Sequence, residues 1–512
     1  MRNKWKRKSL AMLLALCMVF TMMPAAFAAD DGGESQTLQT DVSDGAQSNE
    51  ENALQAQIDS AESGATITLN EDTTVASLTI PEDKNITLDL GGYTLTVSEY
   101  TTFHELSWDL NTGILNKGTL SIVNGTIKGT GSDTDSIGVI TNYGSLTLAE
   151  NLTVSNPIVN GNGIANFGGT IISSADISVM GLYDAIQTYG GTLTINGGNV
   201  TASYGYGITA FNRGYDNESA GANVTINGGS FEVAYYALST NNVRSGGETP
   251  SNATINGGSF AATKATAIYW PSAGTLTVGT VGGDNAAVSI TAEKGSAIEV
   301  CSGTLAVNSG TLKGSDSNDA LNASSDMAAA YRANSGCAGI GDAVSIIARR
   351  GSGYDTAALN VAINGGAFSS SDNYAVRYFD CNQVADAKQI DQDVDVAIKG
   401  GTFTFAGSTQ GSAIDASVVA NADKKFISGG TFSHDVSGYV ATGYSCTGSG
   451  SNYVVAESEH GAMTVAPETT DSGEVSASLE GIYKNDNTVI TGSGREKTSR
   501  LARMKMVKLR SI

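Results

Sequence analysis

Basic residues and long apolar runs are both scarce in this chain of 512 residues. Its 29 Lys and Arg stand against 51 Asp and Glu, so the formal net charge is −22. Because phosphate groups bind to clustered cations, this balance disfavours nucleic acid and anionic lipid as partners. No stretch after residue 28 approaches the roughly 18 apolar residues that span a bilayer, so we expect no membrane-spanning segment beyond that point.

Proline and charge are also low, whereas glycine is abundant. The chain has six prolines and 62 glycines, and only 16% of its residues are charged. This composition is unlike that of an ordinary globular enzyme and is typical of short strands joined by many tight turns. We therefore expect an all-β protein.

Cysteine is rare too, and one of the five lies in the N-terminal segment. A bridge between Cys301 and Cys337 stays open, because connectivity does not follow from sequence. Wide spacing in a protein with a long core favours free thiols. The four later cysteines are Cys301, Cys337, Cys381 and Cys446.

Residues 1–28 have the pattern of a signal peptide. Basic residues come first, an apolar run follows, and Ala26-Phe27-Ala28 is a small-x-small cleavage site. We therefore expect a secreted protein, extracellular or associated with the cell surface. Residues 29–50 are acidic and lack hydrophobic periodicity, which predicts a disordered leader.

A tetrapeptide of isoleucine, asparagine and two glycines recurs at intervals of about 30 residues, the spacing of a solenoid of stacked units. We expect the first glycine of each pair to have a positive φ, the asparagines to join amide to amide along the stack, and the phenylalanines that follow to be structural. The copies are INGGNV (195–200), INGGSF (226–231), INGGSF (255–260) and INGGAF (363–368), with degenerate forms IKGGTF (398–403) and ISGGTF (427–432).

A second phrase, of which GVITNYGSLTL (138–148) is one copy, lies between these repeats. Each turn therefore carries at least two short strands in which inward aliphatic and outward polar residues alternate. The sequence predicts a parallel β-helix of about 12 turns over residues 51–455. Leu54, Ile58 and Ala61 predict a short helix that covers its first sheet edge.

The repeat pattern ends after Val455. Residues 456–494 are predicted to be a linker followed by a partial β module. Residues 495–512 are strongly basic, which fits either an interaction tail or a shifted or truncated reading frame, and we favour the second.

These features resemble the right-handed parallel β-helix proteins of the pectin-lyase-like superfold, and especially the adhesin-like secreted repeat proteins of Gram-positive bacteria. The resemblance covers about residues 52–455 and depends on the first helix, the NITLDLGGYTLTV opening (85–97) and the repeated INGG corners. The superfold hosts lyases, hydrolases and binding proteins, so the resemblance implies a fold without choosing an activity.

The catalytic groups that the resemblance implies are paired aspartates with a histidine and a basic residue, or calcium-binding aspartates with a basic residue. The three histidines lack a Gly-His-Gly setting, and the hydrolase motifs Asn-Thr-Asp and Arg-Ile-Lys are absent. Solvated charge is the favoured interpretation of the remaining candidates. These candidates are Asp184, Asp342, Asp415, Arg349, Arg350 and Arg377.

Acidic pairs and triplets also lack the spacing of a calcium loop. We therefore expect no metal site, no cofactor and no catalytic residue. The clusters are Asp133/Asp135, Asp316/Asp319 and Asp391/Asp393/Asp395.

Aromatic residues follow four successive ladder isoleucines, and two orientations are open. Outward rings would form a flat stripe on which sugars stack, whereas inward or half-buried rings, the favoured orientation, would form a structural stack. The outward orientation supplies the candidate carbohydrate-binding residues Tyr143, Phe167, Tyr189, Phe211, Tyr269 and Trp270.

Two functions from different classes follow. The first is a noncatalytic, adhesin-like protein that presents an extended face to glycans or to host and neighbouring-cell surfaces. The alternative is a polysaccharide lyase or glycoside hydrolase that acts on an acidic glycan with Asp184 or Asp342 and Arg349 or Arg377. The alternative requires these carboxylates and arginines to meet in one groove.

Overall fold

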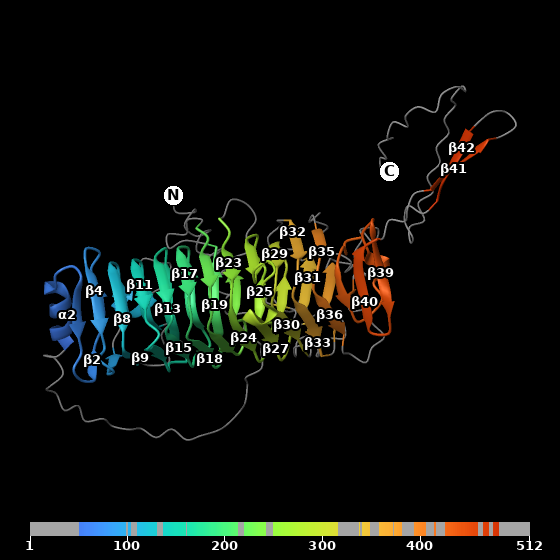
Figure 1. Cartoon of the computed structure of the whole chain (residues 1–512). Helices are drawn as coiled ribbons and strands as arrows, with labels where there is room; N and C mark the ends of the chain where they lie inside the picture. Colours follow the sequence, from blue (N-terminus) through green and yellow to red (C-terminus); the bar gives the residue numbers. More distant parts are fainter. Residues whose placement is uncertain are drawn as a thin grey trace, which may run out of the picture.

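The computed structural model consists of three long sheets of stacked strands, and each turn of the chain adds one strand to each sheet (Figure 1). Almost all strand pairs are parallel, which confirms the predicted β-helix; the sequence had suggested at least two strands per turn, and the structure has three. The structure describes residues 51–98, 101–103, 110–130, 137–159, 161–212, 220–241, 249–315, 337, 340–348, 358–371, 373–380, 394–405, 414–415, 425–458, 464–469 and 475–480.

The first sheet has 12 strands. In spatial order they are β1 (Ala65–Thr68), β4 (Asn85–Asp89), β8 (Thr119–Val123), β11 (Ser145–Leu148), β14 (Thr170–Ser173), β17 (Thr192–Ile195), β20 (Asn223–Ile226), β23 (Asn252–Ile255), β26 (Thr275–Val278), β29 (Gly303–Val307), β32 (Leu359–Ile363) and β35 (Val394–Ile398).

The second sheet has 13 strands. They are β3 (Leu78–Ile80), β7 (Leu110–Asn116), β10 (Ile137–Asn142), β13 (Gly161–Phe167), β16 (Asp184–Tyr189), β19 (Tyr206–Phe211), β22 (Leu238–Asn241), β25 (Ile268–Trp270), β28 (Ile298–Val300), β31 (Val344–Ala348), β34 (Val376–Asp380) and β37 (Ile414–Asp415), with β6 (Thr101–Phe103) antiparallel to β7.

The third sheet has 15 strands. They are β2 (Thr73–Val75), β5 (Thr94–Val97), β9 (Gly125–Gly129), β12 (Leu152–Asn156), β15 (Asp176–Val179), β18 (Asn199–Ala202), β21 (Ser230–Val233), β24 (Gly258–Ala262), β27 (Val288–Ala292), β30 (Thr311–Gly314), β33 (Ala367–Ser370), β36 (Thr402–Phe405), β38 (Gly430–Phe432), β40 (Asn452–Glu457) and β39 (Tyr444–Ser449).

Both ends of the stack carry covering elements. Helix α2 (Glu51–Ser60) packs Leu54 and Ile58 into the core of the first turn, as predicted. The side-chain amide of Gln55 accepts a hydrogen bond from the backbone N–H of Thr79 and donates one to its carbonyl, each at 2.9 Å, and so replaces a missing strand on β3. At the other end, β40 pairs antiparallel with β38 and with β39. Short 3-10 turns lie at Asn285–Ala287 and Ser437–Tyr439.

Two antiparallel strands, β41 (Thr464–Thr469) and β42 (Val475–Glu480), lie within the range predicted as linker and partial β module. No helix in the described part of the chain is long and apolar enough to cross a membrane. The predicted signal peptide, leader and basic tail lie outside the described residues.

The INGG corners differ from the prediction in one respect. The positive φ belongs to the second glycine of each pair, for example +103° at Gly229 and +109° at Gly258, and not to the first. The first glycine serves close stacking, since a Cβ on Gly257 would lie 2.6 Å from the carbonyl oxygen of Asn227 in the previous turn. Gly197, in the first copy, has no atom within 4 Å of that position.

The asparagines of these corners form the predicted ladder. Asn227 donates to Asn196 at 2.8 Å, and Asn256 donates to Asn227 at 2.9 Å. The ladder resumes where Asn364 donates to Asn308 at 2.8 Å. Asn308 belongs to a degenerate corner, VNSG, that the sequence pattern did not reveal.

Aromatic stacking continues past the corners. Phe231 lies on Phe260 with ring centroids 4.7 Å apart, and Phe403 lies between Phe368 and Phe432 at 4.8 and 4.7 Å. All five rings are buried, which confirms that they are structural.

Two alanine substitutions at the first glycine of a corner, one where space is tight and one where it is open, test whether close stacking requires glycine there. Gly257→Ala places a methyl group against a backbone carbonyl, so we expect it to lower the free energy of unfolding by about 1–3 kcal/mol. Gly197→Ala meets open space and should change it by less than about 0.5 kcal/mol. Urea unfolding followed by circular dichroism measures both, and equal effects would contradict the close stacking of the corners.

Candidate functional site

The outer face of the 13-stranded sheet gathers most of the buried groups that could carry chemistry. Inward-facing Ile298, Val344 and Val376 belong to the main core, so their neighbours in the strands face outward. One outward position is occupied in successive turns by Gln187, Thr209, Ser239, Tyr269, Glu299, Ser345, Arg377 and Asp415.

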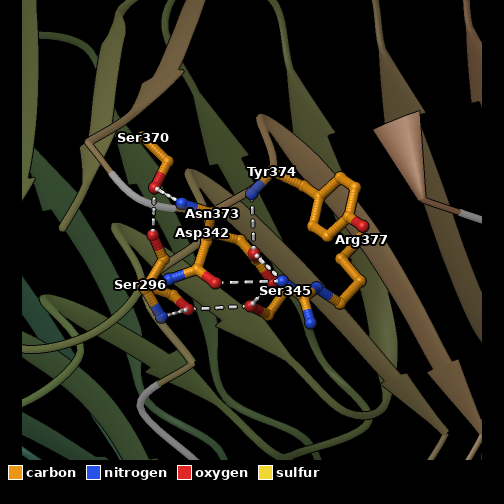
Figure 2. A network of polar contacts seen from close by, with 8 residues as sticks. Ser296, Asp342, Ser345, Ser370, Asn373, Tyr374 and Arg377 are labelled. Atoms are coloured by element: carbon orange, nitrogen blue, oxygen red, sulfur yellow. Dashed lines mark hydrogen bonds and ion pairs between the residues drawn. The ribbon is translucent and has the colours of Figure 1, made fainter. Parts of the chain in front are cut away.

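Asp342 and Arg377 form an ion pair on this face, with Oδ1 and Nη2 3.1 Å apart (Figure 2). The other contacts of Asp342 come from the hydroxyl of Ser345, at 2.9 Å from Oδ2, and the backbone N–H of Tyr374, at 3.1 Å from Oδ1. The guanidinium of Arg377 lies 4.4 Å from the centroid of the Tyr374 ring and donates to Asn373 at 3.2 Å. Each partner is therefore oriented by several fixed contacts.

This ion pair is too deeply buried to serve as a substrate site. The side chain of Asp342 is inaccessible to solvent, and that of Arg377 is 11% exposed. The pKa of Asp342 lies above its ordinary value because burial, the largest effect, outweighs the positive charge of Arg377 and the hydrogen bonds. A carboxylate whose contacts are all internal is not presented to a glycan; the pair instead joins the turn of β31 to the turn of β34.

Asp184 lies at the start of β16 on the same face and is also buried. Its carboxylate accepts hydrogen bonds from the Thr209 hydroxyl and, at 2.6 Å, from the Gln187 side chain. Burial raises the pKa of Asp184 to about 6, although both hydrogen bonds act in the opposite direction. The nearby Tyr206 phenol has a raised pKa for the same main reason.

Asp184 begins β16 and Asp342 lies just ahead of β31, far along the stack. Five strand steps separate β16 from β31 in the sheet order, which is about 24 Å at the usual spacing. Asp342 therefore meets Arg377, but Asp184 does not share a groove with them. Arg349 and Arg350 lie outside the described residues, and so do the side-chain surroundings of Asp415.

Between the aspartates, tyrosines and thiols form a separate apolar cluster. Its buried members include Tyr236, Tyr269, Cys301 and Cys337. The Tyr236 phenol accepts a hydrogen bond from the backbone N–H of Cys337 at 3.0 Å. Neither Cys301 nor Cys337 forms a disulfide, and burial raises the pKa of Cys337 to about 11. Cys446 forms none either, and Cys381 lies outside the described residues.

The aromatic stripe has the half-buried orientation, not the exposed one. Tyr143, Phe167, Tyr189 and Phe211 stack on one another with centroid distances of 5.3, 4.8 and 4.2 Å. Because each inner ring is covered on both faces by its neighbours, the flat exposed platform assumed for sugar stacking does not form. Phe167, Tyr189 and Phe211 are at most 6% exposed, and Tyr143 is half-buried.

Tyr269 and Trp270 are not exposed either. Tyr269 is 2% exposed within the tyrosine and thiol cluster, and Trp270 is fully buried. The indole of Trp270 donates to the carbonyl of Gly274 at 3.1 Å. Carbohydrate binding by the six aromatic residues stays a prediction, but the outward-facing, exposed rings on which it was based are not present.

No group of three or more His, Cys, Asp or Glu side chains with metal-binding geometry occurs among the described residues. Of the three acidic clusters considered for calcium, only Asp395 is described. His434 forms a hydrogen bond with Ser433 at 2.9 Å and packs edge-on against Phe405, and the other two histidines lie outside the described residues.

Searches against protein-family models, curated proteins and solved structures found no match to this chain.

The pH dependence of stability tests the environment of Asp184. The folded pKa, about 6, lies above the reference value of 3.8, so folding favours the protonated acid. The stabilisation is complete below pH 3.8 and is lost as the pH rises through about 6. Asp184→Asn cannot titrate, so its stability relative to wild type should rise between pH 4 and 7. Thermal unfolding at several pH values measures this, and parallel pH profiles would contradict the assignment.

Proposed function

We propose that the protein is a noncatalytic, adhesin-like β-helix that is secreted or held at the cell surface and binds glycans or other cell surfaces along an extended outer face. The export-signal pattern of residues 1–28 supports the location. The resemblance of the repeat to secreted adhesin-like β-helices supports the class of function.

One observation carries the proposal: the outer face of the 12-stranded sheet displays a row of side chains in register over nine turns, and all but one of them can form hydrogen bonds. Eight of the nine positions have a hydroxyl group, and all are exposed or half-exposed. Such a row offers a repeated set of donors and acceptors without charge. Its members are Thr66, Thr87, Ser121, Thr147, Ile172, Thr194, Thr225, Thr254 and Thr277.

The alternative, a lyase or hydrolase of acidic glycans, is favoured by the contact between Asp342 and Arg377. Two properties count against it. Asp342 is inaccessible, and the chain has a net charge of −22, which repels an acidic polymer. Binding without turnover therefore fits the described residues better.

A glycan array probed with the purified full chain tests the proposal. We expect binding to a subset of glycans that weakens little with added salt, because the exposed rows are uncharged. Incubation of the bound glycans and of polygalacturonate with the protein should release no reducing ends and no unsaturated products. Products whose release stops in the Asp342→Asn variant would establish the enzymatic alternative instead.

A further inference from the structure

An open, shallow hollow of about 670 Å³ lies at the corner between the 12- and 15-stranded sheets in the early turns of the stack. Side chains from three successive turns line it, and they are all polar. Among them, Asp89 lies at the end of β4, Asn124 ahead of β9 and Asn151 ahead of β12; Thr126 and Thr153 belong to the same lining.

The backbone of this corner keeps the hollow free of large side chains. Gly91, Gly92 and Asn124 have φ values of +62°, +89° and +58°. Asn124 is the one residue other than glycine with a positive φ in the described part of the chain, a conformation that asparagine tolerates better than most residues. A Cβ on Gly92 would meet no atom within 4 Å, so this glycine borders open space.

Asp89 is held in place through one of its two oxygens. Oδ1 accepts the backbone N–H of Gly91 at 2.9 Å and the side-chain amide of Asn124 at 3.0 Å. Among the described residues, Oδ2 accepts no hydrogen bond. These two donors lower the pKa of Asp89, so the carboxylate is charged at neutral pH. A fixed, ionised and half-exposed acceptor is therefore available at the hollow.

The asparagines are fixed in the same way. The side-chain N–H of Asn151 donates to the side-chain oxygen Oδ1 of Asn124, and Oδ1 of Asn151 accepts the backbone N–H of Asn124 at 3.4 Å. A side-chain amide has two N–H groups, and each of these residues uses one in the contacts above. The second N–H of each, together with the two threonine hydroxyls, adds donors next to the Asp89 acceptor.

We propose that this hollow binds one unit of an uncharged sugar through its adjacent hydroxyl groups. Oδ2 of Asp89 accepts from the sugar, and the amides of Asn124 and Asn151 donate to it. This inference rests on the proposed function and names a subsite for it. Unlike the mostly apolar clefts that enclose drug-sized ligands, this hollow is open and lined by polar side chains, which suits recognition of a sugar through its hydroxyl groups.

The chemistry of the lining favours an uncharged sugar over other ligands. A single carboxylate is a poor site for calcium, which takes six to eight oxygen ligands and usually several carboxylates. An anionic sugar would meet the charge of Asp89 within a protein of net charge −22. A cluster of acceptor, amide donors and hydroxyls matches the mixed donors and acceptors of a neutral sugar.

Saturation-transfer NMR with the full chain tests the site, with glucose, galactose, mannose and N-acetylglucosamine as probes and with glucuronate and calcium chloride as the competing classes. We expect at least one uncharged sugar to bind. Asp89→Asn should weaken that binding by about tenfold or more, because it removes a charged hydrogen-bond acceptor.

Asp176→Asn is the matched control. Asp176 also accepts a backbone N–H and an asparagine amide, from Asn199 at 2.8 and 3.0 Å, but it does not line the hollow. It should bind sugar like wild type. Asn124→Gly retains the positive φ while removing the amide, so it decides the matter if Asp89→Asn does not fold.

The outcomes distinguish failure of the sugar site in the hollow from failure of the proposed function. Glycan-array binding that survives unchanged in Asp89→Asn and Asn124→Gly overturns the hollow and leaves the proposed function standing. Binding of calcium or glucuronate in place of uncharged sugars overturns the assignment of the ligand. The absence of any glycan binding by the wild-type chain overturns both proposals.

Discussion

Stacking of each turn on the one before is the constraint on which the rest of this structure depends. Parallel strands lie about 4.8 Å apart, so every side chain meets the residue at the same position one turn away. Isoleucines stack on isoleucines, the phenylalanines after the corners stack at 4.7–4.8 Å, and asparagines join asparagines. A residue type fits a position of the stack only if its side chain can contact the same residue type, or a complementary one, in the next turn.

The same stacking buries the side chains that could act as catalytic groups. On the outer face of the 13-stranded sheet, Asp342 pairs with Arg377 in the next turn; the Asp342 side chain is inaccessible to solvent, and that of Arg377 is largely buried. On the 12-stranded sheet the outward hydroxyls remain exposed or half-exposed. Asp184 and Asp342, which look catalytic in the sequence, are therefore buried in the stack, whereas uncharged polar residues form the available surface.

The sequence was sufficient for the fold because its signals are periodic. Helix α2, the strand segments and the asparagine ladder all follow from repeats or amphipathic spacing. It misplaced the positive φ within each glycine pair, since adjacent glycines are indistinguishable by composition. It named Asp342 and Arg377 as candidates without establishing their contact, and it did not reveal the hollow at Asp89, because irregular insertions and single corners leave no period. Gly91-Gly92 and Asn124-Gly125 are turn signals in the sequence, but they do not reveal a hollow.

The central claim is that polar groups inside the stack hold its turns in register. Asn142 is fully buried; it donates to Asn166 at 2.8 Å and accepts from Asn116 at 2.7 Å, whereas Asn227 belongs to the exposed ladder. Comparison of the free energies of unfolding of Asn142→Ala and Asn227→Ala tests this most directly. The account predicts a loss of about 2–4 kcal/mol for the first, because its partners stay buried and unpaired, and about 1 kcal/mol or less for the second. Equal losses would contradict it.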